Sequence, residues 1–189
     1  VQDTIHDVFV EKLVAATAEL KMGNGLDEGV QQGPLVNEKA VEDVDRLVRL
    51  STEAGARVAL GGARSDLGAC YYQPTVLTGI TSDMAVFRNE IFGPVAPVMS
   101  FADETEAIAL ANDTEFGLAS YFYTRDIGRV WRVSEGLDYG MVGVNEGIIS
   151  NEMAPFGGVK ASGSGREGSK YGIDDYLEIK YILMGGLDR

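Results

Sequence analysis

The sequence has almost none of the residues that build disulfides or metal centres. Its 189 residues include one cysteine, Cys70, and one histidine, His6. A single thiol cannot form an internal disulfide, and one histidine with one cysteine cannot supply the ligands of an ordinary zinc site. We therefore expect neither a disulfide framework nor a metal site in this chain.

Basic residues and long apolar runs are also scarce. The chain has 16 Lys and Arg against 29 Asp and Glu, a formal net charge of -13, and no cluster of basic and aromatic residues. Nucleic acid is therefore not an expected partner. No run approaches the ~20 apolar residues that span a bilayer, and the first residues do not resemble an export signal. We expect a cytoplasmic protein and, because the chain begins without Met, a fragment of a longer one.

The remaining composition is that of a globular domain, with 45% apolar and 24% charged residues. Apolar spacing predicts a first helix of about five turns, capped by Asp3 or Thr4 and ended by Gly23. Its apolar face comprises Ile5, Val8, Phe9, Leu13, Ala16 and Leu20. A second amphipathic helix is predicted over 37–55. Its inward residues are Val41, Val44, Leu47 and Val48.

Strands and helices alternate through the rest of the chain. Strands are predicted at 57–60, 71–77, 95–101, 118–124 and 141–144. Pro74 favours an edge or irregular position for the second of these. Asp103 and Asp126 are predicted to cap the two helices between the last three strands. The expected fold class is α/β, with a three-layer, mostly parallel sheet covered by helices on both faces.

The end of the chain differs from this pattern. A glycine-rich segment, 156–172, precedes a stretch in which Leu177, Ile179, Tyr181 and Leu183 alternate with polar residues. This spacing predicts a half-buried strand beyond the main core. Because such a strand has unpaired edges, we expect it to associate with another domain or subunit.

One motif in the glycine-rich segment matches the dinucleotide fingerprint GxGxxG, at 163–168. In that fingerprint a strand leads into the first glycine and a helix N-terminus receives the pyrophosphate. Here a loop precedes the motif and the predicted strand follows it. We therefore interpret the motif as a turn.

The single thiol is not expected to be a nucleophile. A reactive cysteine needs a base or a positive field, whereas Cys70 follows Ala69 and precedes two tyrosines, and His6 lies far away in the sequence. We predict a packed thiol and a surface histidine. No catalytic residue is expected in this chain.

Two other stretches carry the candidate site. Glu90 and Phe92 precede a predicted strand, and in an extended backbone both would point to the same side. A carboxylate can accept hydrogen bonds from ribose hydroxyls, and an aromatic face can pack on a heteroaromatic ring. Taken alone, the pair also fits a surface glutamate beside a core phenylalanine. The second stretch is the loop 145–160, at the carboxyl edge of the sheet, where open α/β sheets bind ligands.

Several separated motifs resemble the NAD(P)-dependent aldehyde dehydrogenase superfamily over essentially the whole chain. They read, in order, EIFGPV, GLASYFYT, VGVNEG and APFGGVKASGSGREGSKYGIDDYLEIKY. Within that family, NEGIISNEMAPFGGVKASG is most similar to the succinate-semialdehyde dehydrogenases. The resemblance implies that 1–172 is the C-terminal part of the catalytic domain and that 173–189 is an oligomerisation arm, giving a dimer or a tetramer.

The resemblance also implies site roles. Glu90 would hold the nicotinamide ribose of NAD or NADP, and Phe92 would pack beside the nicotinamide ring. Phe156 would line the tunnel to the thiol, and Ser150 would donate a hydrogen bond to the distal carboxylate of the substrate, a charge-assisted and therefore strong contact. Ser150 also fits a loop-capping serine.

In this family a cysteine thiolate attacks the aldehyde, hydride passes from the thiohemiacetal to NAD(P)+, and a glutamate activates water. By the resemblance, those groups and the Rossmann-type domain lie upstream of Val1. We therefore expect the intact enzyme to oxidise succinate semialdehyde to succinate and this chain alone to be inactive. Glutarate semialdehyde or another carboxylated aldehyde is an alternative substrate, and a non-catalytic association module is an alternative role.

Overall fold

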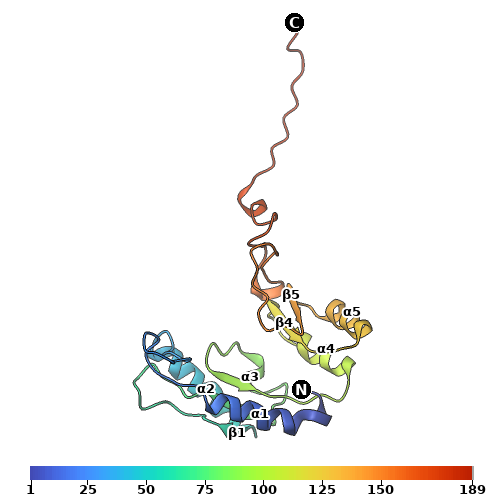
Figure 1. Ribbon diagram of the computed structural model, residues 1–189. Helices are drawn as coiled ribbons and strands as arrows, with labels where there is room; N and C mark the ends of the chain where they lie inside the picture. The colour runs from blue at the N-terminus through green and yellow to red at the C-terminus, as the bar shows by residue number, and fades with distance from the viewer. Residues whose placement is uncertain (189) are drawn as a thin grey trace. The chain divides into compact units, whose positions relative to one another are not determined.

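A computed structural model describes residues 1–188, which form two compact units. The first unit is Val1–Ala107 and the second begins at Ile108. Figure 1 labels several of the helices and strands of both. No helix within the described residues is long and apolar enough to cross a membrane. The cytoplasmic location stays a prediction.

The first unit is built on a three-stranded sheet in the order β1-β2-β3. β1 is Arg57–Leu60, β2 is Thr75–Thr78 and β3 is Val95–Pro97. β1 pairs with β2 antiparallel, and β2 pairs with β3 parallel. The edge alternative for the Pro74 strand is wrong, because β2 is central, but its pairing with β1 is irregular, with a register shift between Val58 and Leu60. Pro74 stands just before the ladder, so its missing N–H removes no strand hydrogen bond.

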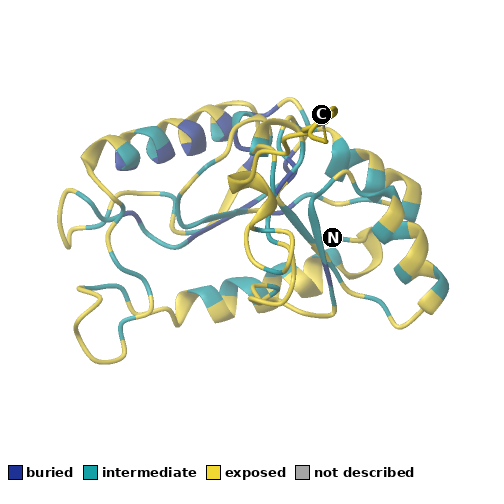
Figure 2. Ribbon diagram, turned by 90° about the horizontal axis from the view of Figure 1, so that it is seen from above, coloured by how far each residue is buried: buried dark blue, intermediate teal, exposed yellow. Residues whose placement is uncertain are grey.

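The helix α2, Glu38–Glu53, packs on this sheet as its amphipathic pattern predicts. Asn37 caps it, since its side-chain oxygen accepts a hydrogen bond from the Ala40 N–H at 2.9 Å. The predicted inward face is confirmed, and Figure 2 shows buried positions recurring along this helix. The main core comprises Val41, Val44, Leu47, Val48, Ala56, Tyr72, Leu77, Ile80, Met84 and Val86.

The first helix differs from its prediction in length, cap and face. A 3-10 turn, Asp3–Ile5, precedes α1, His6–Ala18, and no side chain caps either element. The half-buried side of α1 comprises His6, Val10, Leu13, Val14 and Thr17. The predicted face is largely exposed, with Val8 at 58%. Because α1 carries apolar residues on more than one side, spacing alone did not select the packed one.

The second unit contains a parallel pair of strands, β4 and β5, joined by α5. β4 is Ala119–Phe122, α5 is Ile127–Gly136 and β5 is Met141–Val144. The Asp126 cap is confirmed by a hydrogen bond from the Arg129 N–H to its carboxylate at 3.0 Å. The α/β class with parallel strand pairs is likewise confirmed, but the described strands form two sheets and β1 is antiparallel.

Two shorter α-helices and two 3-10 turns complete the fold. They are α3 at Ala85–Arg88, α4 at Glu104–Asn112, and the 3-10 turns Lys160–Ser162 and Asp174–Tyr176. The predicted cap of α4 is confirmed, because the Glu106 N–H donates to the Asp103 carboxylate at 2.9 Å. Residues 177–184 form no strand pairing within the described part of the chain. Ile179 is fully exposed, at 100%. The arm strand and its partner stay a prediction.

Candidate cofactor and substrate loops

The loop between α3 and β3 holds Glu90 and Phe92 in the first unit. Its first anchor is buried: the Ser51 hydroxyl of α2 accepts a hydrogen bond from the Val86 N–H of α3 at 3.1 Å. Its second anchor is Gly93, where an added Cβ would lie 2.5 Å from Cγ2 of Val44. The loop therefore packs against α2 at both ends, and a side chain at Gly93 would not fit.

Phe92 is held in an unusual conformation at the tip of this loop. Its φ is 47°, in the left-handed region that non-glycine residues seldom adopt, and its side chain is 81% exposed. Glu90 is also exposed, whereas Ile91 between them packs against the core. The extended backbone assumed for this pair is therefore wrong at Phe92. Instead, a half-buried Ile91 leaves both neighbours at the surface, where an exposed strained aromatic is a candidate contact.

The loop after β5 begins with a residue that the sequence reasoning missed. Asn145 has φ 56°, and its side chain accepts a hydrogen bond from the Thr124 N–H at 2.8 Å and donates one to the Thr124 carbonyl at 2.7 Å. These two bonds join the carboxyl ends of β4 and β5. An Asn directly after a strand is the signal that could have been used, because Asn tolerates this backbone region.

Ser150 lies farther along the same loop. It is exposed, and within the described residues its hydroxyl makes no hydrogen bond. The loop turns at other side chains, since the Asn151 carboxamide accepts a hydrogen bond from the Met153 N–H at 2.8 Å. The loop-capping role considered for Ser150 is therefore wrong, and its hydroxyl is available to an external acceptor.

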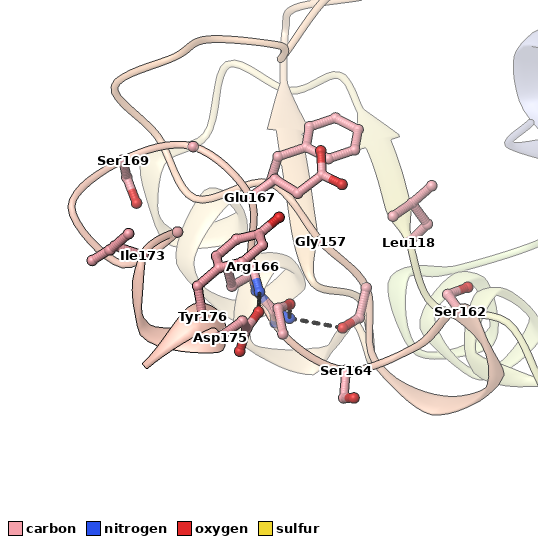
Figure 3. A pocket seen from close by; sticks show the side chains of 15 residues that line it. Leu118, Gly157, Ser162, Ser164, Arg166, Glu167, Ser169, Ile173, Asp175 and Tyr176 are labelled. Atoms are coloured by element: carbon pink, nitrogen blue, oxygen red, sulfur yellow. Dashed lines mark hydrogen bonds between the residues drawn. The ribbon is translucent and has the colours of Figure 1, made fainter. Parts of the chain in front are cut away.

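Phe156 ends this loop and begins the glycine-rich segment. It is half-buried, and its backbone exchanges two hydrogen bonds with Glu167, at 2.9 Å and 2.7 Å. Phe156 lines one wall of a pocket of about 820 Å³ within the second unit, together with Leu118 and the segment 157–176 (Figure 3).

The match to the dinucleotide fingerprint is part of this packed turn, as interpreted from the sequence. The Arg166 guanidinium donates hydrogen bonds to the carbonyls of Gly158 and Gly165, at 2.8 Å and 2.6 Å. Its backbone N–H donates to the Asp175 carboxylate at 3.1 Å (Figure 3). Within the described residues no strand leads into Gly163 and no α-helix begins after Gly168. Arg166 therefore positions the Phe156 loop, a role that the motif did not reveal.

Lys160 anchors the first part of the glycine-rich segment 156–172. Its ammonium group donates to the Thr114 carbonyl at 2.9 Å and lies 5.5 Å from the centre of the Tyr139 ring. Burial, and secondarily the charge of Asp138, raises the pKa of Tyr139 above 10.0. The Tyr139 hydroxyl donates a hydrogen bond to the Ala111 carbonyl at 2.7 Å.

Cys70 and His6, neither of which was expected to be catalytic, make local structural contacts. Cys70 is half-buried, and its carbonyl accepts a hydrogen bond from the Leu35 N–H at 2.8 Å. His6 lies 3.0 Å from the Asp7 carboxylate. Within the described part of the chain no three His, Cys, Asp or Glu residues gather as a metal site would require. The four site residues thus fall in pairs: Glu90 and Phe92 share one loop, and Ser150 and Phe156 share another.

Comparison with known proteins adds an independent finding. The model of the aldehyde dehydrogenase family matches residues 1–182. The chain is 59% identical over 189 residues to a 3-sulfolactaldehyde dehydrogenase of Pseudomonas putida, covering 100% of this chain and 39% of that protein. It is 57% identical over 187 residues to a glutarate-semialdehyde dehydrogenase of Pseudomonas aeruginosa, covering 99% and 39%.

A solved structure agrees with these relatives. The crystal structure of succinate-semialdehyde dehydrogenase from Burkholderia pseudomallei has a TM-score of 0.93 and 56% identity, and the match covers 96% of this chain and 38% of that chain. The chain therefore spans about two fifths of the length of the relatives that it matches.

Proposed function

Because the chain belongs to the aldehyde dehydrogenase family, we propose that it is part of an NAD(P)-dependent enzyme that oxidises succinate semialdehyde to succinate. The names of the three relatives support the substrate class, since each names an aldehyde that also carries an acid group. In the balanced reaction the aldehyde and water give the carboxylic acid, a hydride passes to NAD(P)+, and one proton is released to solvent.

The observation that carries the substrate assignment is the unbonded hydroxyl of Ser150. It is exposed in the loop at the carboxyl end of β5, beside a strand junction that Asn145 holds in place. A hydroxyl donor is suited to the distal carboxylate of the substrate, because a hydrogen bond to a charged acceptor is stronger than a neutral one. Phe156 supplies an apolar wall for the aldehyde chain.

The cofactor assignment rests on the loop of the first unit. Glu90 offers exposed carboxylate oxygens to two ribose hydroxyls, and Phe92 offers an exposed ring to a nicotinamide. The packing of Gly93 against Val44 fits this role, because it fixes Phe92 before any ligand arrives. When bound, NAD or NADP supplies the hydride acceptor.

The remaining machinery is proposed to lie outside this chain. Within the described part of the chain the only thiol, Cys70, has no positive partner, and no glycine-rich turn lies between a strand and a helix. We therefore expect the nucleophile, the base and the Rossmann-type domain in the rest of the enzyme, and no turnover from the chain alone. Exposed apolar side chains in 173–188 support an oligomer built through that arm.

Glutarate semialdehyde is the second candidate substrate, because the Pseudomonas aeruginosa relative is named for it and a hydroxyl selects the acid group more firmly than chain length. Rates of the intact enzyme with succinate semialdehyde, glutarate semialdehyde and butanal separate these candidates. The proposal expects the highest kcat/KM for succinate semialdehyde and the lowest for butanal, which lacks the acid. Equal values for all three would contradict it, and no activity with any aldehyde would favour a non-catalytic association module.

A further inference from the structure

Gly143 lies in the middle of β5 directly opposite Tyr121 of β4. It is buried, and its φ lies outside the left-handed region, so its backbone conformation is open to any residue. Glycine is therefore needed at residue 143 for the space that a side chain would fill, not for its backbone conformation.

The space above Gly143 is occupied by two side chains. A Cβ on Gly143 would lie 2.6 Å from Cδ1 of Tyr121 and 2.9 Å from Cγ2 of Ile149. Both distances are well below ordinary carbon contacts of about 3.5–4.0 Å. Ile149, which is half-buried, thus rests in a notch that exists only because residue 143 is glycine.

Ile149 immediately precedes Ser150, so the notch fixes the loop beside the hydroxyl. The other fixed point is Asn145, whose carboxamide accepts a hydrogen bond from the Thr124 N–H and donates one to the Thr124 carbonyl. Between them Ile148 is 79% exposed and makes no comparable anchor.

Resting on the proposed function, we infer that Gly143 and Ile149 are positioning residues that place the Ser150 hydroxyl for the acid group of the substrate. A methyl group at residue 143 would push Ile149 out of the notch by several tenths of an ångström or more. Since a displacement of about 1 Å can cost about 100-fold in rate, the contact between Ser150 and the acid group would weaken while an acid-free aldehyde would react as before.

The test is Gly143→Ala in the intact enzyme, read as the ratio of kcat/KM for succinate semialdehyde to kcat/KM for butanal. We expect the ratio to fall about 10- to 100-fold, mainly through a higher KM for succinate semialdehyde. The matched control is Gly147→Ala in the same loop, whose Cβ would meet only the Tyr123 hydroxyl, at 3.9 Å. That variant should keep the wild-type ratio.

A second variant covers the case in which Gly143→Ala does not fold. Ile149→Ala removes the anchoring side chain without adding an atom, and it should lower the same ratio. The double variant should lower the ratio no further than the more damaging single change, because both changes remove one contact.

The outcomes separate this inference from the function on which it rests. If the wild-type enzyme prefers succinate semialdehyde and both variants keep that preference, or lower both rates equally, the positioning role is wrong and the function stands. If the wild-type enzyme shows no preference for the acid-bearing aldehyde, the proposed function fails and this inference fails with it.

Discussion

Replacing Ser150 by alanine should remove one hydrogen bond and leave the protein otherwise intact. The hydroxyl makes no bond within the described residues and the side chain is exposed, so Ser150→Ala leaves no buried group unsatisfied. Its effect on folding should stay within about 0.5 kcal/mol, as for other surface substitutions.

The effect on the substrate should be larger, because the proposed acceptor is charged. Hydrogen bonds to charged groups are worth about 1.5–3 kcal/mol, which corresponds to roughly a 10- to 150-fold loss in kcat/KM for succinate semialdehyde. Butanal has no acid group to accept this hydrogen bond, so its kcat/KM should change less than about twofold.

Steady-state rates of the intact enzyme, followed by the absorbance of the reduced cofactor, measure both effects. Ser150→Thr is the matched control, since it keeps a hydroxyl at the same position and should retain most of the preference. The reasoning would be refuted by a Ser150→Ala enzyme that keeps its preference for succinate semialdehyde, or by one that loses activity equally with both aldehydes.

Three further predictions concern the cofactor loop, a helix cap and the isolated chain. Gly93→Ala should raise the KM for the cofactor and destabilise the protein by about 1–3 kcal/mol, because the added Cβ would clash with Val44. Adding Val44→Ala should partly restore both the KM and the stability. Cofactor titrations and denaturation curves of the single and double variants measure the two effects. Backbone hydrogen bonding, first from the Arg129 N–H, lowers the pKa of Asp126 from its ordinary value of 3.8. The charged cap therefore stabilises the folded protein above that pH, and this stabilisation is lost as the pH falls through the lowered pKa. Asp126→Asn should make the free energy of unfolding less dependent on pH in this acidic range. The purified 189-residue chain should give no aldehyde-dependent reduction of NAD or NADP, and a signal above the enzyme-free control would show that the nucleophile lies within it.

The sequence predicted the elements whose pattern is local. Helix α2 has one apolar face and a side-chain cap, and strands β1 and β5 are short runs between glycines or turns, so spacing and capping sufficed. The Asp126 cap followed from the same reasoning, because the hydrogen bond joins residues three apart.

Other features depend on contacts between distant residues. The packed side of α1 is chosen by β1 and β2, which its own spacing does not encode, and the central place of β2 depends on pairing with β1 and β3. Phe92 adopts its left-handed conformation next to Gly93, which lies on Val44, nearly fifty residues earlier. Periodicity contains no information about such long-range packing.

The candidate site also contains residues that the sequence identified and residues that only the structure identified. Glu90, Phe92, Ser150 and Phe156 came from side-chain chemistry and from the family resemblance. The residues that fix their loops, Asn145, Gly143 and Arg166, became visible only through hydrogen bonds and close approaches in the structure. A positioning residue is recognised by its contacts, so composition and motif spelling did not identify it.

The central claim is that the loop after β5 presents Ser150 to the acid group of an aldehyde. A crystal structure of the intact enzyme with succinate bound tests it most directly. We predict the Ser150 Oγ within about 2.5–3.0 Å of a distal carboxylate oxygen, the range of an O–H···O hydrogen bond. A carboxylate held by other residues, with the Ser150 hydroxyl facing solvent, would contradict the claim.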